Sequence, residues 1–593
     1  MQYDCRIEDK LLICTLTPDR LLGGATFCFS GMAPLEPVEG GRLKTALGSY
    51  TEVDLPEIRA GHPHQVILRY SDGYSPANRA WMPLGPYLRH KGEIIVLPPT
   101  PEGPRYKKPQ AKDIPDLLSI VPLPQSWKPS GQHIKVDGFD VVDDDDAIAA
   151  VAALAGRQSL RFLGSHPTTI THEDLPEDAY RLIIAPDRIK IAASSYGGRF
   201  YAGITLLILL RAGSLPCGEI YDAPRFAWRG QHLDTARHFY EPTTISALLD
   251  LMAMFKLNRF HWHFADDEAF RIELAGLPDF TEALEFRGEG QFLPALFAGS
   301  PVQGGKYTQD TVRDLISHAA SLNIEVLPEI EAPAHALALA RVFPDTRDPD
   351  DTGAETSVQG YQANVLNPAM PRTWEVLEAI VDEVCDLFPF GHLHLGCDEL
   401  PKETWGGSPK ARALMEEHGL ETTEDLQGWT IAKLAKYTAR KGCRPAAWEE
   451  AAQGSNGGIG NNAILFSWTG QGPGLDAARA GYDVVMTPAQ HVYFDMAHSN
   501  DVDDWGASWA AFIGLEDTVA WDPVPDPSLA NRIIGVQGAF WSEFTTHDAD
   551  LWPMLMPRML GSAMMAWQVE KPEAENLVAL SQRFSVNENG RLL

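Results

Sequence analysis

The chain has 593 residues, which is too long for one ordinary hydrophobic core and predicts roughly two to four domains. Its hydrophobic share of 44% and charged share of 22% are typical of a soluble globular protein. The formal net charge of −31 argues against a phosphate backbone or an anionic lipid surface, because both would be repelled. We therefore expect neither a nucleic acid nor a membrane as partner, whereas a neutral sugar is compatible with this charge.

The cysteines and the apolar segments are also informative. The 7 cysteines are widely spaced and predict neither a zinc site nor a disulfide framework. Residues 1–6 lack the basic start and apolar core of a secretory signal peptide, and the longest largely apolar run, residues 204–210, is too short to span a bilayer. These features predict a cytoplasmic protein.

Short strand-like runs separated by Gly, Pro and Asp fill the N-terminal region, residues 1–105. We expect strands at residues 11–16, 25–30, 65–70 and 93–97. These runs predict a small β-sandwich. The Pro-rich stretch at residues 98–104 predicts a stiff linker that follows it.

Strand-like and helix-like segments alternate in the next region, residues 115–222. The expected strands are residues 159–163, 180–185 and 188–193, and the expected helices are residues 143–155 and 198–210. This order predicts a small α/β domain with one helical layer on a sheet.

A longer alternation occupies residues 226–593. We expect strands at residues 230–235, 259–264, 324–330, 392–396, 444–449, 463–468, 482–487 and 533–541, and helices at residues 244–255, 309–322, 372–387 and 423–441. This alternation predicts an α/β fold, a (β/α)8 TIM barrel that serves as the catalytic domain. No glycine-rich phosphate fingerprint follows a strand, which disfavours a dinucleotide fold. The helix after the fifth strand is short or absent, near residues 454–460.

Carboxylates, histidines and tryptophans stand at the predicted ends of the barrel strands. They occur at residues 234–238, 261–267, 329–335, 398–399, 448, 468, 493–495 and 541–543, in strand order. Strand ends form the active-site face of a TIM barrel. Indole rings pack on the C–H faces of pyranoses, and carboxylates and Arg bind their hydroxyls. Glycosidic cleavage also needs a carboxylic acid that protonates the leaving oxygen. The set therefore predicts a sugar site.

Two chemistries compete for this face of the barrel. An Asp-Glu dipeptide usually only solvates a loop, but Asp398 and Glu399 follow a strand at the barrel mouth and are candidates for acid–base catalysis. Alternatively, His261, His263 and Asp266 allow a metal-dependent hydrolase. They lack the i,i+4 helical spacing of a zinc hydrolase, so we expect no metal and no cofactor.

Several ordered motifs resemble those of glycoside hydrolase family 20. They are GRFYAGITLL at 198–207, RGQHLDTARHF at 229–239, KLNRFHWH at 256–263 with the acidic pair at 266–267, PEIEAPAH at 328–335, HLGCDELP at 394–401 and GVQGAFWSE at 535–543. The resemblance covers approximately residues 115–570. It implies a β-N-acetylhexosaminidase with the barrel and small α/β domain expected above.

The resemblance implies a retaining mechanism in which the 2-acetamido oxygen of the substrate attacks C1 and forms an oxazolinium intermediate. It implies that Glu399 is the general acid and then the general base, that Asp398 orients the acetamido group, and that Tyr493 donates a hydrogen bond to the acetamido oxygen. An internal nucleophile of this kind acts through high effective molarity when it is held beneath C1.

The same resemblance assigns the sugar-binding residues. Arg237 would hold the 3- and 4-hydroxyls, Asp495 and Glu543 the 4- and 6-hydroxyl side, and Asp266 with His335 would support the acid. Trp448, Trp468 and Trp541 would wall the acetamido pocket, and Trp509 would lie near the aglycone.

The sequence departs from the family pattern at three positions. Cys397 stands where the family has a second glycine, and Ala332 and Ala334 replace the usual Met and Gly. If residue 397 needs a positive φ, the loop is strained there.

Two alternatives stay open beside the proposed hydrolase. One is a related lacto-N-biosidase, and the other is a non-catalytic glycan-binding protein. We expect a small-molecule glycan or glycoconjugate as partner, while the choice between gluco and galacto sugars and the formation of a homo-oligomer stay open. Residues 1–100 carry no motif that we can place. We expect a packing or interface role for the N-terminal domain, because such β units commonly serve as scaffold, and carbohydrate binding is the alternative.

Overall fold

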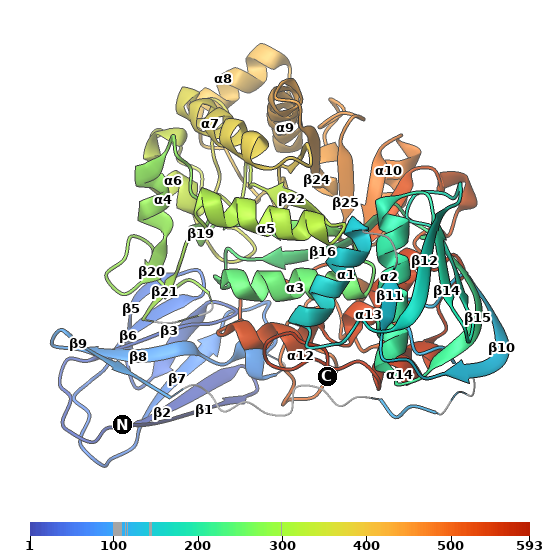
Figure 1. Cartoon of the computed structure of the whole chain (residues 1–593). Helices are drawn as coiled ribbons and strands as arrows, with labels where there is room; N and C mark the ends of the chain where they lie inside the picture. Colours follow the sequence, from blue (N-terminus) through green and yellow to red (C-terminus); the bar gives the residue numbers. More distant parts are fainter. Residues whose placement is uncertain are drawn as a thin grey trace.

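The computed structural model describes residues 1–76, 78–98, 109–112, 114, 117–141, 145–297, 299 and 301–593. A β-barrel domain lies at the centre, a small α/β domain lies beside it on the right of the view, and a β-sandwich lies at the lower left (Figure 1). The predicted linker at residues 98–104 lies outside the described residues except for Pro98.

The N-terminal sandwich consists of two antiparallel sheets, as the sequence predicted. One sheet has the order β1 (Gln2–Glu8), β2 (Leu11–Thr17), β7 (His64–Tyr70) and β4 (Leu35–Glu39). The other has the order β5 (Arg42–Leu47), β6 (Tyr50–Asp54), β3 (Thr26–Ser30), β8 (Leu84–His90) and β9 (Glu93–Val96). Alternate residues such as Leu12, Phe27, Phe29 and Leu68 fill the space between the sheets.

The small domain is a 6-stranded sheet with two helices on one face. The strand order is β10 (Ser126–Ile134), β15 (Leu215–Asp222), β13 (Tyr180–Ile184), β14 (Ile189–Ala193), β12 (His166–His172) and β11 (Phe139–Val141), and the helices are α1 (Asp146–Arg157) and α2 (Tyr196–Arg211). Helix α2 is apolar on nearly all sides because it lies between this sheet and the barrel.

The strand predicted at residues 159–163 is wrong. This segment is the exit from α1, where Leu160 N–H donates to Ala155 O at 2.8 Å and Ser159 has a φ of 57°. Phe162 is buried between exposed neighbours, which imitates the alternation of a strand. Only one bridge forms there, from Leu163 to Phe139, and the strand itself starts later, at His166.

The central domain is a closed barrel of eight parallel strands, which confirms the predicted fold. The strands are β16 (Trp228–Asp234), β17 (Arg259–His263), β22 (Glu325–Glu329), β23 (His392–His394), β24 (Arg444–Trp448), β25 (Ile464–Ser467), β26 (Asp483–Met486) and β27 (Ile533–Gly538). Parallel strands bring all their carboxyl ends to one mouth.

Helices surround most of the barrel. They are α3 (Pro242–Met254), α4 (Pro278–Leu284), α5 (Gln309–Ser321), α6 (Leu337–Val342), α7 (Pro371–Leu387), α8 (Pro409–His418), α9 (Thr423–Arg440), α10 (Gln471–Arg479), α11 (Ala489–Val492), α12 (Leu551–Leu555), α13 (Arg558–Trp567) and α14 (Ala574–Ser581). After β24 only a 3-10 turn, η3 (Glu449–Ala452), precedes β25, in agreement with the weak helical pattern there. Among the described residues, no helix is long and apolar enough to cross a membrane.

Different domains contact the two ends of the barrel. The small domain is joined to the end of the barrel at which β16 begins, by two buried ion pairs: Arg229 with Asp178 at 2.9 Å and Lys256 with Asp222 at 2.7 Å.

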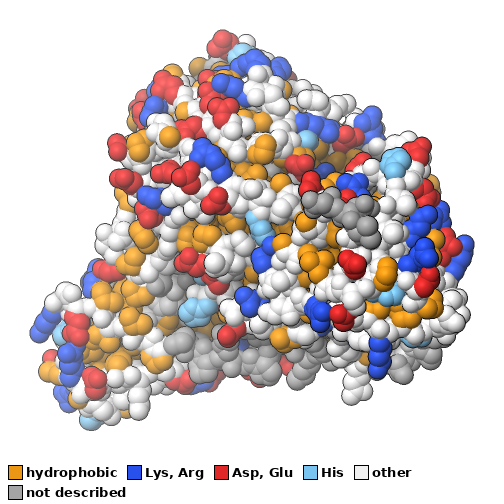
Figure 2. All heavy atoms as spheres, in the orientation of Figure 1, with side chains coloured by type: hydrophobic (Ala, Val, Ile, Leu, Met, Phe, Trp, Pro, Cys, Tyr) orange, Lys and Arg blue, Asp and Glu red, His pale blue; other side chains and the backbone are white. Residues whose placement is uncertain are grey.

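Lys and Arg side chains are interspersed with Asp and Glu over the face shown in Figure 2. This mixture is typical of a solvated surface.

The N-terminal sandwich packs on the loops at the barrel mouth. Its Cys28, Tyr50 and Tyr87 form an apolar cluster with barrel residues that include Phe297 and Tyr361. The loop strands β20 (Phe286–Gly288) and β21 (Val302–Gly304) lie directly above the sandwich in Figure 1. At this contact Gly48 is required, because a Cβ there would lie 1.8 Å from the Tyr361 ring.

Candidate active site

A cavity of about 410 Å³ opens at the mouth of the barrel. The predicted site residues that line it are Arg237, His335, Asp398, Glu399, Trp448, Trp468, Tyr493, Asp495, Trp509, Trp541 and Glu543. Of the predicted set, only Asp266 lies outside the lining, behind His335. The strand ends of one barrel therefore bring together residues that are far apart in the sequence.

The loop after β23 places the adjacent carboxylates of Asp398 and Glu399 on one side. Gly396, Cys397 and Glu399 all have a positive φ, of 66°, 81° and 50°. In a strand these neighbours would face opposite sides, but the left-handed turns bring both toward His335. His335 Nε2 lies 3.6 Å from Asp398 Oδ2 and 3.1 Å from Glu399 Oε2.

Two of these backbone positions differ in what they tolerate. A Cβ on Gly396 would lie 1.8 Å from Oε2 of the buried Glu331. Cys397, which stands where the family has a glycine, does have a positive φ. Its carbonyl accepts a hydrogen bond of 3.0 Å from Gln427 Nε2. Gly396 is thus required by both space and φ, whereas position 397 accepts a small side chain at the cost of strain.

We expect Gly396→Ala to lower kcat by at least about tenfold, because the loop that carries Asp398 and Glu399 must move to clear Glu331. The matched variant Cys397→Gly relieves an unfavourable φ of 81° and should retain activity, with a free energy of unfolding within about 1 kcal/mol of the native value. Steady-state kinetics and thermal unfolding of both variants check this. Wild-type activity in Gly396→Ala would contradict the assigned role of the glycine.

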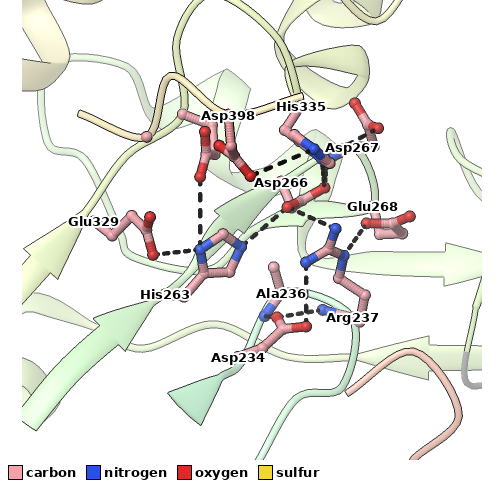
Figure 3. Close-up of polar contacts among 12 residues, drawn as sticks. Asp234, Ala236, Arg237, His263, Asp266, Asp267, Glu268, Glu329, His335 and Asp398 are labelled. Carbon is pink, nitrogen blue, oxygen red and sulfur yellow. Dashed lines mark hydrogen bonds and ion pairs between the residues drawn. The ribbon is translucent and has the colours of Figure 1, made fainter. Parts of the chain in front are cut away.

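A row of hydrogen-bonding groups runs from Glu329 through His263 and Asp266 to His335 (Figure 3). It ends at Glu399. His335 Nδ1 lies 3.2 Å from Asp266 Oδ1, and its Nε2 lies 3.1 Å from Glu399 Oε2. Burial disfavours a charge on His335, but the carboxylates of Asp266 and Asp398 outweigh burial and raise the pKa of His335 well above its ordinary value. His335 is therefore a charged donor that fixes the carboxylate of Glu399.

The row continues inward through His263. Its Nε2 lies 3.0 Å from Asp266 Oδ2, and its Nδ1 lies 2.6 Å from Glu329 Oε2. Burial lowers the pKa of His263, but Glu329 and Asp266 outweigh burial and raise it to about 10. A buried imidazolium between two carboxylates holds Asp266, and through it His335, in one orientation.

Arg237 is held at the inner end of the cavity by carboxylates. Its guanidinium lies 2.9 Å from Asp266, 2.9 Å from Glu268 and 3.4 Å from Asp234. Its plane also lies over the Trp541 ring, with 5.3 Å to the centroid. These contacts fix the cation in the wall of the cavity, where it is able to donate to sugar hydroxyls.

Asp398 is almost fully buried. Burial raises its pKa to about 6, with His335 acting in the opposite direction and Glu399 adding to the rise. Its Oδ1 is buried and accepts no hydrogen bond from any described residue. Buried carboxylate oxygens are normally paired, so Asp398 offers an acceptor for a donor group on a substrate. Glu399 is more open, with 26% of its side chain exposed, as proton exchange with water requires.

Tryptophans and Tyr493 wall the cavity around this pair. Trp448 and Trp541 lie with ring centroids 5.9 Å apart, and Tyr493 stacks on Trp468 at 6.5 Å with an angle of 15°. The indole N–H of Trp468 donates to Glu450 at 3.1 Å, and its backbone N–H donates to Glu449 at 2.5 Å. Both glutamates belong to the short turn η3, which stands after β24 in place of a helix. This turn therefore holds Trp468 in the cavity wall.

Asp495 and Glu543 form a second acidic pair in the cavity. Burial raises the pKa of Glu543 to about 7, against the effect of Arg237. Burial and the neighbouring Glu543 raise the pKa of Asp495 well above its ordinary value. A carboxyl group donates to a hydroxyl when it is protonated and accepts from one when it is ionised. This chemistry suits a polyhydroxylated ring.

The structure does not bring His261, His263 and Asp266 into one group. His261 Nε2 contacts Glu329 at 3.2 Å and Gln537 Nε2 lies 2.9 Å from His261 Nδ1, inside the barrel. Clusters with ligand-like spacing occur among the described residues, but they pair His261 with Glu329 and His394, and His263 with Asp266 and Glu331.

Sequence reasoning missed two sets of residues. Glu331 was named only as part of a motif, yet it is buried beside Asp398, and burial and Asp398 raise its pKa well above the ordinary value. Met32, Tyr74 and Trp81 of the N-terminal sandwich line the cavity as well. Glu331 could have been found from the sequence, because it stands at a predicted strand end. The three sandwich residues could not, because they reach the site only through domain packing.

Comparison with known proteins identifies the family of the chain. The profile "Glycosyl hydrolase family 20, catalytic domain" matches residues 226–570, and "Glycosyl hydrolase family 20, domain 2" matches residues 117–223. A beta-hexosaminidase of Vibrio furnissii is 34% identical over 518 residues, which cover 83% of this chain and 84% of that protein. An N,N'-diacetylchitobiase of Vibrio harveyi is 27% identical, over 71% of this chain and 58% of that protein.

The crystal structure of an exo beta-N-acetylglucosaminidase of the same family from Vibrio harveyi, in complex with N-acetylglucosamine, is similar over 98% of this chain and 97% of that chain. Its TM-score is 0.87 and its sequence identity is 28%. The catalytic-domain profile spans more than half of the chain, and the strand-end residues of the barrel meet in one cavity. The chain therefore belongs to glycosyl hydrolase family 20 and is a glycoside hydrolase.

Proposed function

We propose that the chain is a retaining exo-β-N-acetylhexosaminidase that removes a terminal β-linked N-acetylglucosamine or N-acetylgalactosamine. One observation carries the proposal: Asp398 and Glu399, adjacent in the chain, face one tryptophan-walled cavity in which Asp398 Oδ1 has no partner among the described residues. An amide N–H of the substrate is the donor that such an oxygen lacks. The names of the relatives, a beta-hexosaminidase and a diacetylchitobiase, support the same substrate class.

In the first step Glu399 donates a proton to the glycosidic oxygen while the acetamido oxygen of the substrate attacks C1. The C1–O bond breaks, the aglycone leaves as an alcohol, and an oxazolinium ring forms. Asp398 accepts a hydrogen bond from the acetamido N–H and stabilises the positive charge that develops on the nitrogen. Tyr493 donates to the acetamido oxygen and holds it beneath C1.

In the second step Glu399, now a carboxylate, removes a proton from a water molecule that attacks C1. The oxazolinium ring opens and the acetamido group is restored, so two inversions leave the β configuration unchanged. The charged His335, 3.1 Å from Glu399 Oε2, orients the carboxylate in both steps. No protein nucleophile is needed.

The polar residues of the cavity wall support exo action, that is, removal of one sugar at a time from the end of a chain. Arg237 and Asp495 are buried in the cavity wall, and Glu543 lines the same cavity, together with the more exposed Glu399. These groups match the 3-, 4- and 6-hydroxyls of a terminal ring, and a further sugar on those hydroxyls would collide with them.

The 2-substituent of the substrate tests the proposal. We expect an aryl β-glucoside to be cleaved at least about 10³-fold more slowly, in kcat/KM, than the matched aryl β-N-acetylglucosaminide, because the glucoside has no internal nucleophile. An N-acetylglucosamine-derived thiazoline, a stable analogue of the oxazolinium, should inhibit competitively. Comparable rates on both glycosides would rule out substrate assistance.

A further inference from the structure

The N-terminal sandwich sends one loop into the active-site mouth. The loop lies between β7 and β8 and contains the 3-10 turn η1 (Arg79–Trp81). Its Tyr74 and Trp81 line the same cavity as Asp398 and Glu399. The cavity is therefore built by two domains.

This loop is fixed to two barrel loops. The Tyr74 hydroxyl donates to Val358 O at 3.3 Å, and the buried Asn78 Nδ2 donates to Gly506 O at 3.0 Å. Asn78 also caps the turn, since Ala80 N–H donates to Asn78 Oδ1 at 3.1 Å. One side chain thus orders the loop and attaches it to the barrel.

Aromatic and apolar side chains surround the outer part of the cavity. The Tyr74 ring meets Trp81 edge-on, with centroids 6.3 Å apart. On the barrel side Trp509 is 58% exposed, and its ring lies 5.9 Å from Trp468. Val358, whose carbonyl accepts the bond from the Tyr74 hydroxyl, is 59% exposed. Such exposure of large apolar side chains beside a sugar pocket indicates a contact surface for a ligand.

Polar atoms without partners lie in the same region. Neither Trp81 Nε1 nor Gln359 Oε1 forms a hydrogen bond with any described residue. Both residues line the cavity, and the two atoms are a donor and an acceptor. A second pyranose ring with an acetamido group offers a partner to each atom and a C–H face to Tyr74 or Trp509.

We propose that Tyr74, Trp81 and Gln359 form, with Trp509 opposite, a subsite for the sugar on the leaving-group side of the cleaved bond. The inference rests on the proposed hexosaminidase function and deepens it, because it assigns contacts with the leaving-group sugar to a loop of the N-terminal sandwich. The N-terminal sandwich then acts in substrate selection, beyond the packing role expected from its sequence.

The test compares two substrates that share the N-acetylglucosaminyl group and differ in the leaving group: N,N'-diacetylchitobiose, and β-N-acetylglucosaminyl azide, whose leaving group has no ring. We expect Tyr74→Ala to lower kcat/KM for the disaccharide by about tenfold and to leave the azide within about twofold. Tyr74→Phe keeps the ring and should stay near wild type on both substrates. Trp509→Ala, on the opposite wall, should show the same selective loss, so the inference does not depend on one variant folding.

Tyr221→Ala in β15 of the small domain is the control and should change neither rate. Equal losses of Tyr74→Ala on both substrates, or no loss on the disaccharide, would overturn the subsite while leaving the hexosaminidase proposal intact. If the wild-type enzyme cleaved neither N-acetylglucosaminide, the proposed function itself would fail, and the subsite with it.

Discussion

Glu399→Gln is expected to lower kcat by about 10²–10⁴-fold for substrates with a sugar leaving group and far less for those with a good aryl leaving group. A sugar alcohol needs a proton as the C1–O bond breaks, and the amide of glutamine has none to give. An acidic phenol leaves without that help. The dependence of kcat on leaving-group pKa, measured over a series of aryl N-acetylglucosaminides, should be much steeper in the variant than in the wild type.

The surrounding structure supplies a matched control for this variant. Glu403 lies on the same loop but is exposed, so Glu403→Gln changes the same chemical group and should leave kcat unaltered. In Glu399→Gln, the His335 N–H that now lies 3.1 Å from the carboxylate can still donate to the amide oxygen of the new side chain, so the loop should keep its position. Equal losses for good and poor leaving groups would mean that Glu399 does not donate the proton.

Asp398→Asn is expected to lower kcat/KM by about 10²–10³-fold for all leaving groups. In the proposed mechanism the carboxylate both accepts a hydrogen bond from the acetamido N–H and balances the charge of the oxazolinium. Asparagine removes the charge while keeping the shape. A loss that is independent of the leaving group distinguishes this variant from Glu399→Gln. Asp503→Asn, at an exposed position, is the control.

The same residue predicts an acid limit on activity. Because burial raises the pKa of Asp398 to about 6, the group becomes neutral as the pH falls through about 6, and kcat/KM should fall with it. His335, Glu399, Glu329 and Asp266 are the charged groups that act on it. In Asp398→Asn this limb of the pH profile should be lost or displaced. An unchanged limb would assign it to another group, such as Glu543.

Much of the architecture could be predicted because it is local in the sequence. The alternation of strand and helix patterns gave the barrel, and strand ends gave the position of Asp398, Glu399 and the tryptophans, since parallel strands share one mouth. The error at residues 159–163 arose because the end of a helix that packs on the core has the same burial alternation as a strand. Cytoplasmic location and the exact domain boundaries stay predictions.

The remaining site residues depend on contacts that sequence patterns do not encode. Tyr74 reaches Val358, 284 positions away, only because the sandwich packs on the barrel mouth. Glu331 and His263 were visible as polar residues at strand ends, but their ionisation depends on the depth of burial and on the neighbouring histidines and acids. Such states follow from three-dimensional packing and from the low polarity of the interior.

The short turn after β24 has a consequence for how the enzyme recognises sugar. Because Glu450 accepts a hydrogen bond from the indole nitrogen of Trp468, the protein itself holds that ring in place. A wall of this kind loses no torsional freedom when a ring docks on it, so more of the contact energy remains as affinity. If this wall bounds the acetamido pocket, as proposed, its rigidity should also select against substrates with an N-acyl chain bulkier than acetyl.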